Sequence, residues 1–123
     1  MNPLLAAISA RSPDLTRSAL ELGEDPNWRD ESGRVPLHYC GIHKCASCAE
    51  ILIQSGADIN AEDQHGNQPL WTAVFEARGD YSVVSLLMKA KADPNHRNRY
   101  GRSPQMFAEQ IMDAVLVKLL ALA

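Results

Sequence analysis

The sequence predicts an all-α fold in which helix–turn–helix units stack into a solenoid. Residues of one type recur at a fixed spacing, with prolines 33, 33 and 35 residues apart. Aspartates, asparagines and glycines follow the same spacing of 33 and 35. Four markers in one register indicate an internal repeat of about 33 residues. The markers are Pro3, Pro36, Pro69 and Pro104; Asp25, Asp58 and Asp93; Asn27, Asn60 and Asn95; and Gly33, Gly66 and Gly101.

The first repeat, residues 2–30, is expected to hold two helices. Pro3 is tolerated in the first turn of a helix, and Leu4, Ala7 and Ile8 follow it at helical spacing. Ser12 or Asp14 can begin the second helix, and Gly23 ends it in a left-handed conformation. Apolar residues of the second helix are Leu15, Ala19, Leu20 and Leu22, and the polar residues Arg11, Asp14, Arg17, Ser18 and Glu21 give this end of the array a polar cap.

The other three repeats complete one domain over residues 1–123. Residues 31–63 form the second repeat, with helices expected over 36–42 and 48–53, the latter directing Ile51, Leu52 and Ile53 to a core. Residues 64–98 form a third repeat that is longer by two residues. Alignment from both ends places the insertion at 75–78, and such insertions often lie on a binding face. Residues 99–123 form a last repeat without a closing turn.

Two motifs of the second repeat resemble the ankyrin repeat, which has this period and a T-P-L-H-x-A signature. They are residues 33–40 (GRVPLHYC) and 56–60 (GADIN). The resemblance covers essentially the whole chain and implies stacked helix pairs joined by β-hairpin-like finger turns. The family's Thr is replaced by Asn2, Val35, Gln68 and Ser103, and its His is kept only at His38, with Leu5, Trp71 and Met106 elsewhere.

Hydrogen bonds between Thr and His lock neighbouring repeats in this family, and most of them are lost with these replacements. We expect apolar packing to replace them, with Trp71 as the largest contributor.

Composition excludes several classes of function. The net charge of −3 is mild, so nothing indicates nucleic acid or an anionic membrane as a partner. No apolar run is long enough to span a membrane, and the start of the chain lacks the cationic region of a signal peptide. Three cysteines in one short segment suit a reducing cytosol. We therefore expect a cytoplasmic protein.

The segment 38–48 holds five residues that can bind soft metals, two histidines and three cysteines, including a C-x-x-C motif. In the repeat register, Cys40 replaces a buried Ala, Cys48 replaces a buried Ile, and His38 matches the structural His of the family. Only His43 and Cys45 then remain, too few for a zinc site. A structural role is favoured, and a metal- or redox-linked regulator stays open as an alternative. Cys45, near a helix N-terminus, can have a lowered pKa.

No catalytic set is present. The sequence lacks a Gly-rich phosphate loop and the H-E-x-x-H and G-x-S-x-G motifs. We expect a protein that is not an enzyme, with no catalytic residues, no bound metal and no cofactor.

The resemblance implies a concave partner-binding face made by the fingers and the first helix of each repeat. The expected finger tips are Glu31, Ser32 and Arg34; Gln64, His65 and Asn67; and Arg99, Tyr100 and Arg102. The helices are expected to add Ile42, His43, Phe75, Glu76 and Arg78. Trp28 either extends this face or packs against the neighbouring turn.

The third finger holds three arginines and a tyrosine, and Arg and Tyr are enriched at interface hot spots. We expect this finger to meet an acidic patch on a protein partner; a solvated basic loop is the alternative.

Small ankyrin arrays resemble two kinds of dedicated inhibitor: the bacterial immunity protein, or antitoxin, and the kinase inhibitor of four ankyrin repeats. A compact chain that begins at Met1 without a targeting segment or appended domain favours the first. Residues 114–123 carry one charge, at Lys118. An apolar end of this kind is expected to be covered by a partner or a second copy, as in a structural adaptor; a short helix whose alanines expose little apolar area is the alternative.

Overall fold

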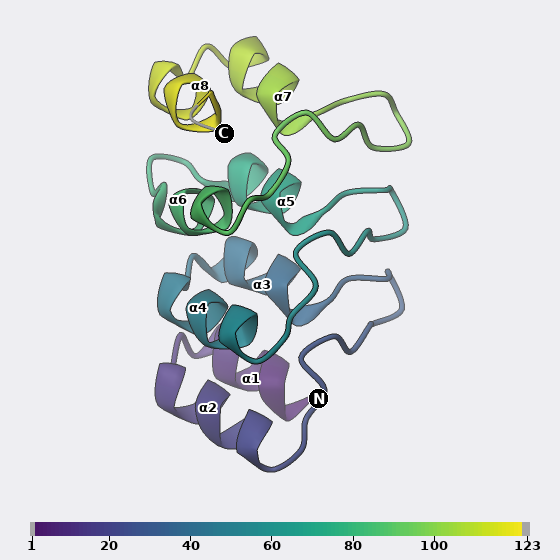
Figure 1. Ribbon diagram of the computed structural model, residues 1–123, viewed down its shortest axis with the longest axis vertical. Helices are drawn as coiled ribbons and strands as arrows, with labels where there is room; N and C mark the ends of the chain where they lie inside the picture. The colour runs from purple at the N-terminus through teal and green to yellow at the C-terminus, as the bar shows by residue number, and fades with distance from the viewer. Residues whose placement is uncertain (1, 122–123) are drawn as a thin grey trace.

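The computed structural model describes residues 2–121; Met1, Leu122 and Ala123 lie outside the described residues. Residues 2–121 form eight α-helices and no strand, stacked as four pairs (Figure 1). None of these helices is long and apolar enough to cross a membrane. The predicted all-α solenoid is confirmed. The helices are α1 (Pro3–Ser9), α2 (Pro13–Glu21), α3 (Pro36–His43), α4 (Ala46–Gln54), α5 (Pro69–Glu76), α6 (Ser82–Lys89), α7 (Pro104–Gln110) and α8 (Ala114–Leu120).

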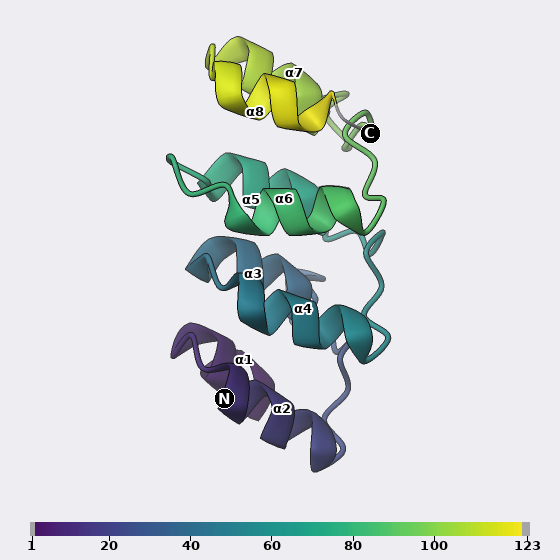
Figure 2. The same ribbon diagram turned by 60° about the vertical axis from the view of Figure 1, so that its left-hand side comes forward.

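The helices form two layers, which the two views separate (Figures 1 and 2). In the layer beside the fingers, α3 packs against α1 and α5, and α5 packs against α7. In the outer layer, α4 packs against α2 and α6, and α6 packs against α8. Leucines from both layers fill the core, each at most 1% exposed, and burying one contributes about 1.5–3 kcal/mol. They are Leu4, Leu37, Leu52, Leu70, Leu87, Leu116 and Leu120.

The helix ends follow the local sequence. α1, α2, α3, α5 and α7 each begin at a proline, whose missing N–H would have no partner in the first turn. The Ser12 hydroxyl caps α2 by accepting the Leu15 N–H at 3.1 Å, so Ser12 rather than Asp14 begins that helix. Gly23, after α2, is left-handed with φ 99°, as predicted. In the third repeat the corresponding position is Lys91, also left-handed, with φ 74°.

The predicted insertion lies in the connection between α5 and α6. Single left-handed residues join the other pairs, namely Arg11, Lys44 and Met112. Here two occur in succession, Arg78 at φ 46° and Gly79 at φ 93°. The finger precedes α5 and this connection follows it, so the insertion lies at the edge remote from the fingers (Figure 1). Phe75 and Glu76, the first two residues of the predicted insertion, still belong to the end of α5, and that the insertion borders a binding face stays a prediction.

The two ends of the array expose apolar side chains. At the N-terminal end, Leu15 is 57% exposed and Leu22 is 86% exposed, among the expected polar residues of α2. Near the C-terminal end, Met112 is 86%, Val115 50% and Ile111 48% exposed. Only part of α8 is buried, through Leu116 and Leu120. The exposed apolar surface at this end is therefore formed by the α7–α8 connection together with Val115 of α8.

Candidate functional site

Three finger turns project from one edge of the array (Figure 1): the first finger (residues 27–35), the second finger (60–68) and the third finger (95–103). Each closes as a hairpin without a regular strand. In the second finger, the Asp63 N–H donates to the Asn67 carbonyl at 3.0 Å. The Asp63 carboxylate also accepts the backbone N–H groups of His65 and Asn67, at 2.8 and 3.0 Å. The Asp63 side chain therefore takes the place of a second pair of backbone hydrogen bonds between the two arms of the finger.

The same device recurs in the other fingers. Asp30 accepts the N–H groups of Ser32 and Arg34, and Asn98 accepts those of Tyr100 and Arg102. Asp30, Asp63 and Asn98 are 33 and 35 residues apart. Sequence analysis missed these residues, although their spacing follows the repeat register and their side chains are turn formers.

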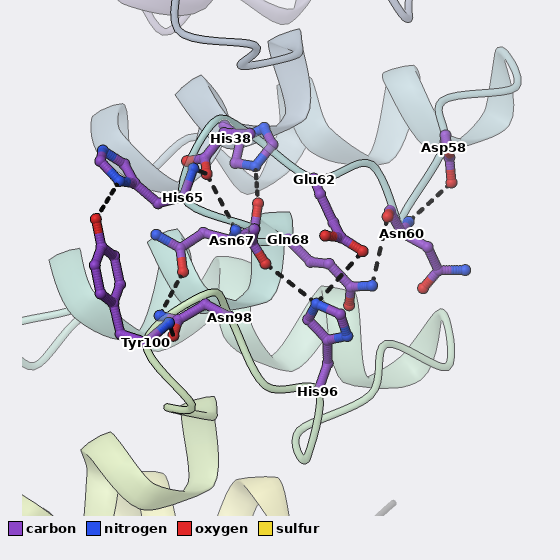
Figure 3. Close-up of polar contacts among 12 residues, drawn as sticks. His38, Asp58, Asn60, Glu62, His65, Asn67, Gln68, His96, Asn98 and Tyr100 are labelled. Carbon is purple, nitrogen blue, oxygen red and sulfur yellow. Dashed lines mark hydrogen bonds and ion pairs between the residues drawn. The ribbon is translucent and has the colours of Figure 1, made fainter.

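Neighbouring fingers are bonded to one another at their tips. Gln64 N donates to Ser32 O at 2.8 Å, and Arg99 N donates to His65 O at 3.0 Å. Between the second and third fingers, the Asn98 side-chain amide also donates to Asn67 Oδ1 at 2.9 Å (Figure 3). The three tips are thus one connected edge.

His38 links the first helix layer to this edge. Its Nδ1 accepts the Val35 N–H at 3.1 Å, so Nε2 carries the hydrogen and donates to the Asn67 carbonyl at 2.8 Å (Figure 3). Burial lowers the pKa of His38, and the Asn67 hydrogen bond and the Asp63 charge only partly oppose this. The structural role predicted for His38 agrees with this neutral, fully buried ring.

A groove of about 210 Å³ lies between the fingers and the inner helices. An aromatic cluster borders it: Trp71 and Phe75 have ring centroids 6.3 Å apart, and Phe107 lies 5.6 and 5.2 Å from them. Trp71 replaces the family's His and packs on the next repeat through Phe107. The sequence predicts apolar packing by Trp71 but not this partner. Phe75 remains 49% exposed. The groove is lined by Arg34, Ile42, Asp63, Asn67, Trp71, Thr72, Phe75 and Glu76.

Five of the residues predicted for the partner-binding face meet in this groove: Arg34, Ile42, Asn67, Phe75 and Glu76. The guanidinium carbon of Arg34 lies 6.0 Å from the centre of the Tyr39 ring.

Tyr39 fixes the first finger to α3. Its hydroxyl donates to the Asp30 carboxylate, and its ring stacks on His43, with centroids 6.5 Å apart. Burial raises the pKa of Tyr39, and the hydrogen bond to Asp30 raises it further. Burial alone would raise the pKa of Asp30, but hydrogen bonds from Tyr39, Arg34 and Ser32 bring it below the ordinary value. The carboxylate is therefore well suited to hold the turn at neutral pH.

The third finger pairs with the second through its tyrosine. Tyr100 is 69% exposed, and its hydroxyl lies 3.0 Å from His65 Nδ1 (Figure 3). Arg99 is exposed beside it. Arg102 is half-buried and donates to the Gln110 side chain. His65, Arg99 and Tyr100 therefore share one exposed corner, whereas Arg102 is partly engaged.

The remaining predicted site residues lie elsewhere. Trp28 and Glu31 border a shallow hollow on the first finger, and Trp28 is 37% exposed. His43 lies at the end of α3, and Arg78 lies in the connection between α5 and α6, beyond the groove. The structure thus separates these four residues from the groove that holds Arg34, Asn67, Phe75 and Glu76.

The three cysteines are free and buried. Cys45 lies at the N-terminus of α4, is only 3% exposed, and has its Sγ 2.6 Å from Cys48 Sγ. Within residues 2–121, no group of three or more His, Cys, Asp or Glu side chains is arranged to hold a metal ion.

The two paired thiols differ in acidity. Burial by itself would raise the pKa of Cys45, but hydrogen bonds from Cys48 and Ser47 and the Arg11 charge bring it below the ordinary value. Burial and the hydrogen bond with Cys45 raise the pKa of Cys48 to about 11. Burial also raises the pKa of Cys40 well above its ordinary value.

Stacked helix pairs with a connected row of fingers define a class of repeat protein that mediates protein–protein interaction. The family model described as "Ankyrin repeats (3 copies)" matches residues 4–98, which is more than half of the chain. The chain belongs to the ankyrin-repeat family.

Three relatives show how widely this repeat is shared. Potassium channel KOR1 of Oryza sativa subsp. japonica is 36% identical over 72% of this chain. NF-kappa-B inhibitor delta of Mus musculus is 30% identical over 81% of this chain. Putative ankyrin repeat protein YahD of Escherichia coli (strain K12) is 28% identical over 72% of this chain. The matches cover 10%, 29% and 43% of these relatives, so the chain spans less than half the length of each.

Proposed function

We propose that this chain is a non-enzymatic inhibitor that binds another protein through the groove and the fingers. The aromatic cluster beside the groove carries the proposal. Phe75 is 49% exposed next to Arg34 and Glu76, so an apolar centre is flanked by charged groups. An apolar core with a polar rim is the usual anatomy of a protein interface. Residues 1–123 act in this proposal as one unit of four repeats.

The proposed partner presents an apolar side chain to the groove and an acidic patch to the third finger. Arg97, Arg99 and Tyr100 are exposed there, and Tyr and Arg are common interface hot spots. An interface of standard size, about 800 Å² per partner, needs both the groove and the finger edge.

We assign the chain to the immunity-protein, or antitoxin, type, which covers the active site of a toxin or other enzyme. The name of the mouse relative, NF-kappa-B inhibitor delta, describes another ankyrin-repeat protein as an inhibitor. The proposed place of action is the cytoplasm, where three free cysteines stay reduced.

Affinity capture from the source cells tests this proposal with a matched pair of variants. Phe75→Ala with Tyr100→Ala removes exposed rings from the groove and the finger corner. Leu15→Ala with Leu22→Ala removes apolar side chains that are also exposed, from α2 and its C-cap in the outer helix layer. A hot-spot truncation costs about 2 kcal/mol or more, so the first variant should weaken binding of a captured partner more than about tenfold.

Wild type and the α2 variant should retain that partner, and its activity should be lost in the complex. If the partner keeps its activity in the complex, the chain is a binding module and not an inhibitor. A partner retained equally by both variants would remove the groove from the proposal.

A second candidate role rests on the exposed C-terminal surface. Met112, Ile111 and Val115 are between 48% and 86% exposed on the last described helix pair. We propose that a second copy of the chain, or a partner in a larger assembly, covers this surface. In that role the chain would be an adaptor.

A further inference from the structure

Cys45 and Cys48 form a close thiol pair at the start of α4. Their Sγ atoms are 2.6 Å apart, and the pair lies in the outer helix layer rather than at the groove. A disulfide bond is about 2.04 Å long, so small side-chain rotations bring the two sulfurs to bonding distance. The third cysteine, Cys40, is fully buried on α3.

We propose that Cys45 and Cys48 are a reversible dithiol–disulfide pair that hydrogen peroxide oxidises within one chain, with Cys45 reacting first. This inference is independent of the proposed partner, because it concerns the outer layer of helices. It leaves Cys40 as a spectator thiol.

The surroundings of Cys45 favour its thiolate. Cys45 is the N-cap residue of α4, and its Sγ lies 2.6 Å from Cys48 Sγ and 3.5 Å from Ser47 Oγ. The Arg11 guanidinium, held 3.1 Å from the Lys44 carbonyl, adds positive charge nearby. Thiolates rather than thiols attack peroxide, and helix N-termini and cations favour them. The lowered pKa of Cys45 agrees with this arrangement.

Cys48 is placed to complete the reaction. It is fully buried, and Thr16 Oγ1 of α2 lies 3.4 Å from its sulfur. This contact holds Cys48 Sγ against Cys45 Sγ. Cys45 is only 3% exposed, but exposed Ser47 lies two residues away, and hydrogen peroxide is little larger than water.

The proposed chemistry has two steps. The Cys45 thiolate attacks one oxygen of hydrogen peroxide, an S–O bond forms, and the O–O bond breaks to release hydroxide, which takes up a proton. The resulting sulfenic acid is then attacked by the Cys48 sulfur, whose proton goes to the departing hydroxide. Two thiols thus lose two electrons and two protons, and peroxide becomes two waters. A low-molecular-weight dithiol reverses the change by exchange.

Peroxide treatment of the full folded chain, followed by thiol blocking, digestion and mass spectrometry, tests the inference. We expect the three free thiols to fall to one, with Cys45 and Cys48 joined in one peptide and Cys40 still free. The helical circular-dichroism signal should persist, and a dithiol should restore all three thiols.

Serine variants separate the roles of the three cysteines. Cys45→Ser keeps a good N-cap residue and should slow thiol oxidation on the order of tenfold or more, because the remaining thiols are poorly ionised. Cys48→Ser should accumulate a sulfenic acid at Cys45 that dimedone traps, and Cys40→Ser should behave as wild type. A disulfide through Cys40, a disulfide between two chains, or an unchanged rate in Cys45→Ser would overturn the inference. So would a Cys45–Cys48 pair that stays reduced in the folded chain.

Discussion

At the scale of single residues, His38 joins two repeats through both nitrogens of its ring. Val35 donates to one nitrogen, and the other donates to Asn67. A protonated ring has no acceptor for the Val35 N–H, so only the neutral form satisfies both contacts. The stability of this contact therefore depends on pH.

We predict that acidification weakens the fold through His38. Its pKa is lower in the folded protein than the ordinary 6.5, so the unfolded chain binds this proton more tightly. The contribution of His38 is complete above pH 6.5 and is lost as the pH falls from there toward the folded pKa. Each unit of pKa difference corresponds to about 1.4 kcal/mol.

Urea denaturation at several pH values between about 8 and 5 measures this effect. The matched variant His38→Gln has a donor and an acceptor but does not titrate in this range. It should be less stable at the upper end and should lose less stability on acidification. Equal slopes for the two proteins would show that other groups cause the pH dependence.

At the scale of elements, each finger depends on one side chain that replaces a strand rung. Asp63 is 6% exposed and accepts two backbone N–H groups. Asn98 accepts the two corresponding groups in the third finger. An aspartate and an asparagine therefore do the same work in neighbouring turns.

We predict that Asp63→Ala destabilises the protein by about 1–3 kcal/mol, because two part-buried backbone donors lose their acceptor. Asp63→Asn should cost much less, since an amide oxygen suffices in the third finger. Chemical denaturation gives the free energies, and hydrogen exchange of the His65 and Asn67 amides locates the loss. Equal cost for both variants would point to the charge of Asp63 rather than its oxygen.

Elements were predicted with uneven success, for physical reasons. Pro36, Pro69 and Gly23 determine the backbone where they stand, so helix starts and ends could be read directly. The contact of Trp71 with Phe107 could not be read from the sequence. These two residues are 36 positions apart, whereas equivalent positions of the third and fourth repeats are 35 apart. The contact depends on how far one repeat rotates against the next, which no local pattern encodes.

Within the candidate site, residue type predicted exposure better than position. Tyr100 and Phe75 were expected at the surface and are 69% and 49% exposed. Arg78 was expected on the partner-binding face, and it lies past the end of α5, outside the groove. The proximity of Cys45 and Cys48 was missed, because a spacing of three does not show whether both side chains turn inward.

At the scale of the whole molecule, the exposed C-terminal surface predicts self-association. Met112→Glu with Val115→Glu places charge on this surface. Leu15→Glu with Leu22→Glu makes the same change at the opposite end, where the side chains are 57% and 86% exposed. Sedimentation over a range of protein concentrations should show a dimer for wild type and the second variant, and a monomer for the first.

If the wild-type protein stays monomeric at high concentration, the C-terminal surface does not bind a second copy and is covered by a different partner or by none. Loss of the dimer in both variants would instead indicate an interface between the two ends, which would form open chains.

The hydrogen bonds between finger tips fix the spacing at which the array can contact a partner. Each tip is bonded to its neighbour, from Gln64 to Ser32 and from Arg99 to His65. Because equivalent bonds join both pairs of tips, the tips follow one another at a regular interval, and a bound surface must carry its matching groups at that interval. A further repeat inserted between the second and third fingers would add one finger to the row and leave the existing fingers unchanged.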